Sequence, residues 1–236
     1  MTARSHRGSV LSGATATFEI ARVTLTRTLR QRTLWGAAIV AALPLVLSVI
    51  FNAIARHHTR SIFEAAEATA AVLVGLMVAG AIGEELEERT MTYLWSRPMP
   101  RWALLTGKLA ALVPLTIALG AGGAWLAMSL GANESDTPGR MALAIAMGLA
   151  ARAAVATAFA TLVPRQALAL TIAYLFFIDL PLAIVPARLQ VISIVFHEHE
   201  LATRGMGESV TSALVGLGAI MAAWLALAVW RIRRLE

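Results

Sequence analysis

Long apolar runs dominate the chain, and short segments that carry most of its charge separate them. A transmembrane helix needs about 20 apolar residues to cross the ~30 Å hydrocarbon core of a bilayer. The runs are hydrophobic throughout, without the period-two alternation of a transmembrane β-strand. They therefore predict an all-α integral membrane protein. We expect six transmembrane helices, at about residues 35–54, 66–83, 103–130, 141–163, 167–187 and 210–230.

Composition supports the same class. Of the 236 residues, 58% are hydrophobic and only 14% are charged, which gives more apolar surface than a soluble domain of this length can bury. No composition shift marks a second, soluble domain. We expect one six-span domain at residues 35–230, with residues 1–34 and 231–236 outside the membrane.

Basic residues predict the orientation. Fourteen of the 20 lie on one side of this topology: before the first span, in the loops after spans two and four, and in the C-terminal tail. By the positive-inside rule both termini and the acidic loop after span two are cytoplasmic, and the protein spans the cytoplasmic membrane several times. The net charge of +6 sits at span ends, where lipid headgroups attract it, so we expect membrane lipids and no nucleic acid as partners.

Residues 17–32 predict a cytoplasmic amphipathic helix before the first span. Phe18, Ala21, Leu25 and Leu29 share one face at 100° per residue. Such a helix lies in the membrane interface as an anchor. Contact with a cytosolic partner is a further possibility that the pattern leaves open.

The loop between spans two and three is the most informative stretch. Glu84, Glu85, Glu87 and Glu88 cannot enter hydrocarbon at a cost of about +3 kcal/mol each. They must lie in water or against a protein.

The rest of this loop predicts a short helix and a rigid turn. Thr90, Tyr93 and Leu94 fall on one helical face, and Pro98 moves Arg97 out of the helical region. An ordinary solvated charged segment is the simpler interpretation.

The order of residues in this loop closely resembles the cytoplasmic loop of the type-2 ATP-binding-cassette (ABC) exporter permeases. The residues that carry the resemblance are Glu84, Glu88, Thr90, Leu94, Ser96, Arg97, Pro98, Arg101, Gly107 and Lys108. The six-span layout with an N-terminal amphipathic helix is similar to that family as well. Arg89 stands where many members have glycine.

The resemblance implies a permease subunit that works as a dimer, coupled by this cytoplasmic coupling helix to two separate ATPase subunits. The coupling residues that it implies are Glu84, Glu85, Glu87, Glu88, Arg89, Thr90, Tyr93 and Leu94, with Arg97, Pro98 and Arg101 fixing the turn. We expect no catalytic residue and no cofactor in this chain. Gly107-Lys108 lacks the flanking residues of a phosphate-binding loop, so ATP and Mg²⁺ would bind the partner ATPase.

Two other functions compete with this one. The first is a membrane scaffold or assembly factor that transports nothing. The second is an intramembrane metalloprotease, because Glu84, Glu85 and Arg89 satisfy EExxxR. The only later histidines, His197 and His199, lie in a polar segment without the spacing of a metal motif, so we expect no metal site and interpret the segment as a solvated loop.

Two ionisable residues fall inside the predicted spans. Arg152 lies roughly 16 Å from the outer end of span four, and Asp179 roughly 12 Å from the outer end of span five, at 1.5 Å per residue. Similar depth predicts either an ion pair between the two spans or a place in a translocation pathway. Pro181 should kink the fifth span beside them.

The fourth span also has small residues at four-residue spacing, which allow another helix to approach closely. They are Ala142, Ala146, Ala150, Ala154 and Ala158. Packing inside the bundle and a seam between subunits are both compatible with this ladder.

Overall fold

A computed structural model describes residues 13–54, 59–87, 101–131, 137–185, 188–203 and 208–234. Nearly all of these residues are helical, and none of them is in a β-strand. Six helical segments are long and apolar enough to cross a membrane, which confirms the predicted all-α, six-span architecture. They are Arg32–Ala53, Thr59–Glu84, Trp102–Leu130, Pro138–Leu162, Pro164–Ile184 and Val210–Arg234.

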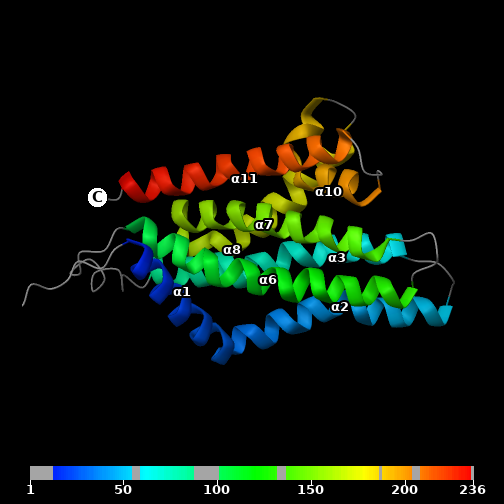
Figure 1. Ribbon diagram of the computed structural model, residues 1–236, viewed down its shortest axis with the longest axis horizontal. Coiled ribbons are helices and arrows are strands. Elements are labelled where there is room, and N and C mark those ends of the chain that lie inside the picture. Colours follow the sequence, from blue (N-terminus) through cyan, green and yellow to red (C-terminus); the bar gives the residue numbers. More distant parts are fainter. Residues whose placement is uncertain are drawn as a thin grey trace, which may run out of the picture.

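The helices follow one another up and down the bundle (Figure 1). The first three spans are formed by α2 (Arg32–Ile54), by the continuous helix of α3 (Thr59–Val74), η1 (Gly75–Gly80) and α4 (Ala81–Glu87), and by α6 (Arg101–Gly131). The last three are formed by α7 (Pro138–Leu162), by α8 (Ala167–Tyr174), η3 (Leu175–Asp179) and α9 (Leu180–Ile184), and by α11 (Glu208–Arg234). The shorter elements are α1 (Gly13–Arg30), η2 (Pro164–Gln166), η4 (Arg188–Ile192) and α10 (Ile194–Thr203).

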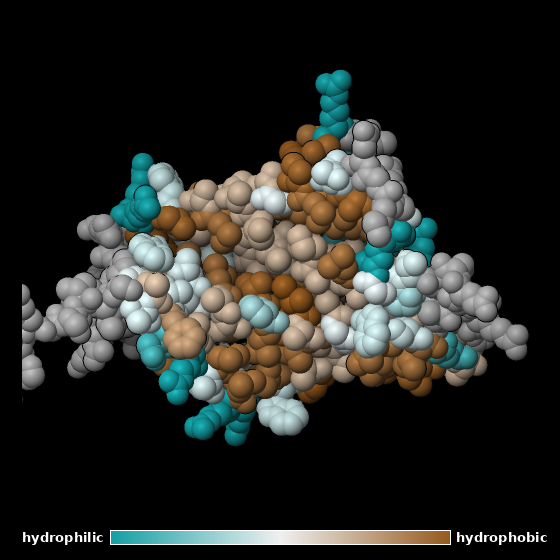
Figure 2. Space-filling view, viewed as in Figure 1, coloured by the Kyte–Doolittle hydropathy of each residue, from teal (hydrophilic) through white to brown (hydrophobic). Residues whose placement is uncertain are grey.

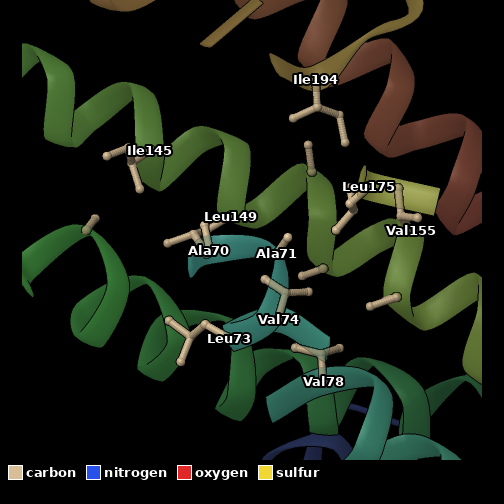
Figure 3. Packing of buried hydrophobic residues seen from close by; sticks show 14 of the residues in the cluster. Ala70, Ala71, Leu73, Val74, Val78, Ile145, Leu149, Val155, Leu175 and Ile194 are labelled. Carbon is tan, nitrogen blue, oxygen red and sulfur yellow. The ribbon is translucent and has the colours of Figure 1, made fainter. Parts of the chain in front are cut away.

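The fourth span lies at the centre of the bundle. In its most apolar window 72% of the residues are buried, against 22% in α2 and in α11, whose other faces are left for lipid. Figure 3 shows Leu149 of α7 beside Ala70 of α3, and Val155 of α7 beside Leu175 of the fifth span.

The alanine ladder of α7 lies in this interior. Ala154 and Ala158 are buried by helices of the same chain, and Ala142 and Ala146 pack against the same core. Packing within the bundle therefore accounts for Ala154 and Ala158, whereas Ala142, Ala146 and Ala150 stay partly exposed, and the seam between subunits stays a prediction.

Glycines set how closely α6 approaches its neighbours. A Cβ at Gly123 would lie 2.8 Å from the carbonyl oxygen of Ala41 on α2, which is too close for a real contact. On the same pair of helices Ser48 Oγ donates a hydrogen bond to the carbonyl of Ala127 at 2.7 Å. A side-chain hydrogen bond between helices in the apolar layer fixes their register.

The second span begins at Thr59, earlier than the Ala66 expected from hydropathy. Glu64 and Glu67 interrupt the apolar run, yet the helix continues through both, and Glu67 is buried. The span also contains the π-helical segment η1, bounded by Gly75 and Gly80. π-Helical turns inside α-helices are rare and concentrate at functional sites.

A second π-helical segment, η3, interrupts the fifth span directly before Pro181. Proline has no N–H to donate to the carbonyl four residues earlier, so the α-helical hydrogen-bond pattern cannot continue through this point. The irregularity expected at Pro181 is present, and it ends on Asp179.

The N-terminal helix α1 packs on α6, where a Cβ at Gly107 would lie 2.8 Å from the carbonyl oxygen of Thr17. Its predicted apolar residues Phe18, Leu25 and Leu29 remain exposed. That exposure fits a helix with one face on the bundle and its apolar residues turned to lipid. Figure 2 shows apolar side chains across the middle of one face of the molecule, with hydrophilic ones toward its ends.

Gly123 and Gly122 make a matched pair for testing the close approach of α2 and α6. The Gly123→Ala substitution should destabilise the protein by about 1–3 kcal/mol through overpacking. Gly122→Ala meets no atom within 4 Å and should be neutral or stabilising by up to about 1 kcal/mol. Thermal unfolding in detergent measures both. Equal stability of the two variants would contradict the packing.

Candidate functional site

The segment before the last span forms a helix, α10, rather than the solvated loop that its charges suggest. Ser193 caps its N-terminus, because Ser193 Oγ accepts the N–H of Phe196 at 3.2 Å. The carboxylate of Asp179 accepts the N–H groups of Ile194 at 2.8 Å and Val195 at 3.3 Å. A carboxylate at a helix N-terminus satisfies orphan donors and opposes the positive end of the helix dipole.

The other end of α10 is held by a cation. Arg140, in the first turn of α7, donates from Nε and Nη2 to the carbonyl of Ala202, at 3.1 and 2.8 Å. A guanidinium on the last carbonyls matches the negative end of the dipole. Charged side chains from two different spans therefore hold α10 at both ends.

The intramembrane arginine is paired with α10. Arg152 Nη1 and Nη2 donate to Glu198 Oε1 and Oε2 at 2.6 and 2.5 Å, and both side chains are almost fully buried. The first of the two alternatives, a direct pair between Arg152 and Asp179, is not formed, since Glu198 takes the guanidinium and Asp179 caps α10. Sequence reasoning missed Glu198 because it assigned that residue to a solvated loop. Both Arg152 and Asp179 line a cavity, and their place in a translocation pathway stays a prediction. A bidentate arginine–carboxylate pair is among the strongest charge-assisted hydrogen-bond arrangements.

Two glycines make room for α10. A Cβ at Gly148 of α7 would overlap the carboxylate of Glu198, and one at Gly216 of α11 would overlap the ring of His197. Gly148 lies four residues before Arg152, on the same face of α7. The gap beside the arginine therefore admits the carboxylate that neutralises it.

Glu67 on α3 completes the cluster. Its Oε2 lies 2.9 Å from His199 Nε2, and the edge of the His199 ring packs on Phe63. Burial lowers the pKa of His199, so the imidazole is neutral at physiological pH and donates from Nε2. Glu67 Oε1 is buried without a hydrogen-bond partner.

Three carboxyl groups share one guanidinium in this interior. Burial raises the pKa of Glu198 well above its usual value, Arg152 opposes that shift, and the neighbouring Glu67 carboxylate adds to it. The two carboxyl groups are neighbours, and like charges in a buried site oppose one another's ionisation.

A cavity of about 480 Å³ opens beside the cluster. Its polar lining includes Glu67, Arg152, Asp179 and His199, and the rest is mainly apolar side chains of the second and fifth spans and of α10. Apolar walls with a few convergent polar groups are typical of a ligand site. Its lining includes α10, which lies toward the end of the bundle opposite the C-terminal end of α11 (Figure 1).

His197 and His199 do not act together as metal ligands. They lie two residues apart on α10, so they point in nearly opposite directions: His197 Nε2 bonds the carbonyl of Val191 at 2.9 Å, while His199 bonds Glu67. Within the described ranges no three His, Asp or Glu side chains gather into a group that could hold a metal ion.

The predicted coupling residues are only partly described. Glu84, Glu85 and Glu87 lie in α4, which continues the second span, and Glu84 is exposed; Arg101 begins α6. The remaining coupling residues lie outside the described residues: Glu88, Arg89, Thr90, Tyr93, Leu94, Arg97 and Pro98.

The helices that bound this loop are held firmly. Lys108 Nζ of α6 donates to the carbonyl of Ala81 at 2.9 Å, although Lys108 is almost fully buried. A Cβ at Gly83 would lie 2.7 Å from the carbonyl oxygen of Pro164, so α4 also touches the short connection between spans four and five. α4 is therefore fixed to the bundle close to the point where its acidic residues begin.

Comparison with protein families gives one finding: the family described as ABC-2 family transporter protein matches residues 68–195. The match extends from the second span, through the acidic loop, to the start of α10. A search of curated proteins found no match.

The Arg152–Glu198 pair can be tested by a double-mutant cycle. Arg152→Met or Glu198→Leu alone leaves a buried charge unpaired and should destabilise the fold by about 3–5 kcal/mol. The double variant should recover most of that loss, because no unpaired charge remains. Unfolding in detergent measures the stability of the two single variants and of the double variant. The comparison is a second double variant, Arg152→Met with Asp179→Asn. Recovery of stability in this second double variant, and not in the first, would contradict the pairing of Arg152 with Glu198.

Proposed function

This chain belongs to the ABC-2 transporter family and is a membrane permease subunit of an ABC transporter. We propose that it couples ATP hydrolysis by a separate ATPase subunit to export across the cytoplasmic membrane. Membership implies an ABC ATPase as partner. The observation that supports the coupling is the acidic end of α4, joined without a break to a span that enters the buried cluster.

The proposed orientation places both termini and the acidic loop in the cytosol. α1, the C-terminal end of α11 and the start of α6 lie at one end of the bundle (Figure 1). Arg231, Arg233 and Arg234 are in the last turn of α11 at that end. The positive-inside rule assigns such an end to the cytoplasm.

The acidic segment that begins at Glu84 is the proposed docking element. Carboxylates at the exposed end of a helix can pair with arginine or lysine on an ATPase subunit. Because Lys108 and Gly83 fix α4 to the bundle, displacement of this end must move whole spans rather than a loose loop. Rigid elements are what transmit a domain movement.

The second span carries that movement to the cluster. Glu67 and Glu84 belong to one continuous helical run and lie 17 residues apart, roughly 25 Å at 1.5 Å per residue. η1 lies between them, and π-helical turns inside α-helices occur frequently at functional sites. A displacement of Glu84 is therefore transmitted along the helix to Glu67, which bonds His199 and lies beside Glu198.

ATP and Mg²⁺ are proposed to bind the partner ATPase, and a second permease copy is proposed to complete the transporter as a homodimer. The apolar side chains that remain exposed on the fifth span, Phe177 at 80% and Ile184 at 73%, lie next to the cavity-lining residues Phe176 and Ala183. A second copy on this face would place two cavities next to each other.

Charge reversal tests the docking proposal. Changing Glu84, Glu85, Glu87 and Glu88 together to lysine should abolish copurification of the ATPase subunit, because acidic-to-basic pairing becomes repulsion. Glu64→Lys is the control: Glu64 is an exposed acid on the same helix toward its opposite end, and its substitution should leave copurification unchanged. If the fourfold variant still copurifies with the ATPase subunit and the complex keeps its ATPase activity, the proposal is contradicted.

A further inference from the structure

We propose that the cavity beside Glu67 binds an amphipathic organic cation, a hydrophobic amine whose ammonium group pairs with the Glu67 carboxylate. The proposal rests on the proposed function, since it names the class of substrate that this permease carries. It is drawn from the cavity lining and from the one polar atom there that has no partner.

The lining selects against a polar or anionic ligand. Leu175, Phe176, Ile184 and Phe196 form apolar walls, whereas the acids Glu64, Glu67 and Asp179 supply negative charge. Arg152, the one arginine of the lining, is already paired with Glu198. A volume of about 480 Å³ lies within the range typical of small-molecule sites. A molecule with an apolar body and one positive end fits this distribution.

Hydrogen-bond accounting identifies where the positive end lies. The guanidinium of Arg152 is bidentate on Glu198, and the carboxylate of Asp179 accepts two backbone N–H groups. Neither group is free to serve a ligand. Glu67 is 7% exposed and lines the cavity, and its Oε1 lacks a donor. A buried carboxylate oxygen without a donor is costly, and an ammonium N–H satisfies it.

Binding forms an ion pair inside the cavity. When R–NH₃⁺ enters, one of its N–H groups donates to Glu67 Oε1, and no covalent bond forms or breaks. The carboxylate then has a donor on each oxygen, His199 on Oε2 and the ligand on Oε1. The positive end of the ligand is thereby paired with a buried negative charge, as a charge in a buried site requires.

The groups that face Glu67 leave Oε1 available to a ligand. Glu198 and His199 on α10, Arg152 on α7 and Asp179 on η3 surround Glu67, as does Glu64 one turn away on α3. Arg152 is paired with Glu198, and His199 bonds the other oxygen of Glu67, Oε2.

The experiment uses the full chain, purified in detergent without its ATPase, and monodansylcadaverine as the probe. This probe has a primary ammonium, an apolar chain and a fluorophore that brightens in apolar surroundings. We expect saturable binding to the wild type and at least a tenfold higher Kd for the N-acetylated, neutral form of the same probe.

Glu67→Gln keeps the shape of the side chain and removes its charge, and it should raise the Kd of monodansylcadaverine at least tenfold. Glu19→Gln, at an exposed acid on α1 and outside the cavity lining, is the matched control and should bind like the wild type. Ala183→Trp fills the cavity without changing any charge and should also abolish binding, which keeps the test decisive if Glu67→Gln folds poorly.

Tight binding that persists in Glu67→Gln or Ala183→Trp, or an equal affinity for the neutral probe, would overturn the inference. Because no ATPase is present, such a result leaves the copurification test of the coupling proposal unaffected.

Discussion

A single arginine in the middle of the fourth span constrains the structure around it. A guanidinium in the bundle interior must meet a carboxylate, because an unpaired charge there is strongly unfavourable. Glu198 meets that requirement, and to do so α10 must fold as a helix and enter between α7 and α11. Gly148 and Gly216 are the spaces into which Glu198 and His197 fit. Asp179 and Arg140 then hold the two ends of α10.

This arrangement joins the cluster to the distant end of the bundle. Glu67 contacts His199 of α10 from a helix that runs without a break to Glu84. Lys108 and Gly83 fix the far end of that helix to α6 and to the connection between spans four and five. The two π-helical segments, η1 and η3, lie in the second and fifth spans, which supply most of the cavity lining. The irregular turns thus occur in the spans that form the cavity walls.

Hydropathy was sufficient for the six spans, because length and apolar composition alone determine which segments can cross a bilayer. The alternating charges of the segment from His197 to Glu200 concealed α10, since charge outside an apolar run usually indicates solvent. Glu67 was missed for a similar reason: it stands just inside the expected start of the second span and reads as a flanking residue. Arg152 and Asp179 were found, but their partners were not. The signals that point to those partners are local: a glycine one turn before a buried arginine, and a serine, Ser193, positioned to cap a helix.

The central claim is that Glu198, seated in the gap at Gly148, holds α10 in the bundle. Hydrogen–deuterium exchange of α10 in the Gly148→Ala variant tests it most directly, because the added methyl group occupies that gap and changes no charge. Gly139→Ala, on the same helix with no atom within 4 Å, is the control. The account predicts slow exchange of the α10 amides in the wild type and in Gly139→Ala, and much faster exchange in Gly148→Ala. Equal protection of α10 in all three proteins would contradict it.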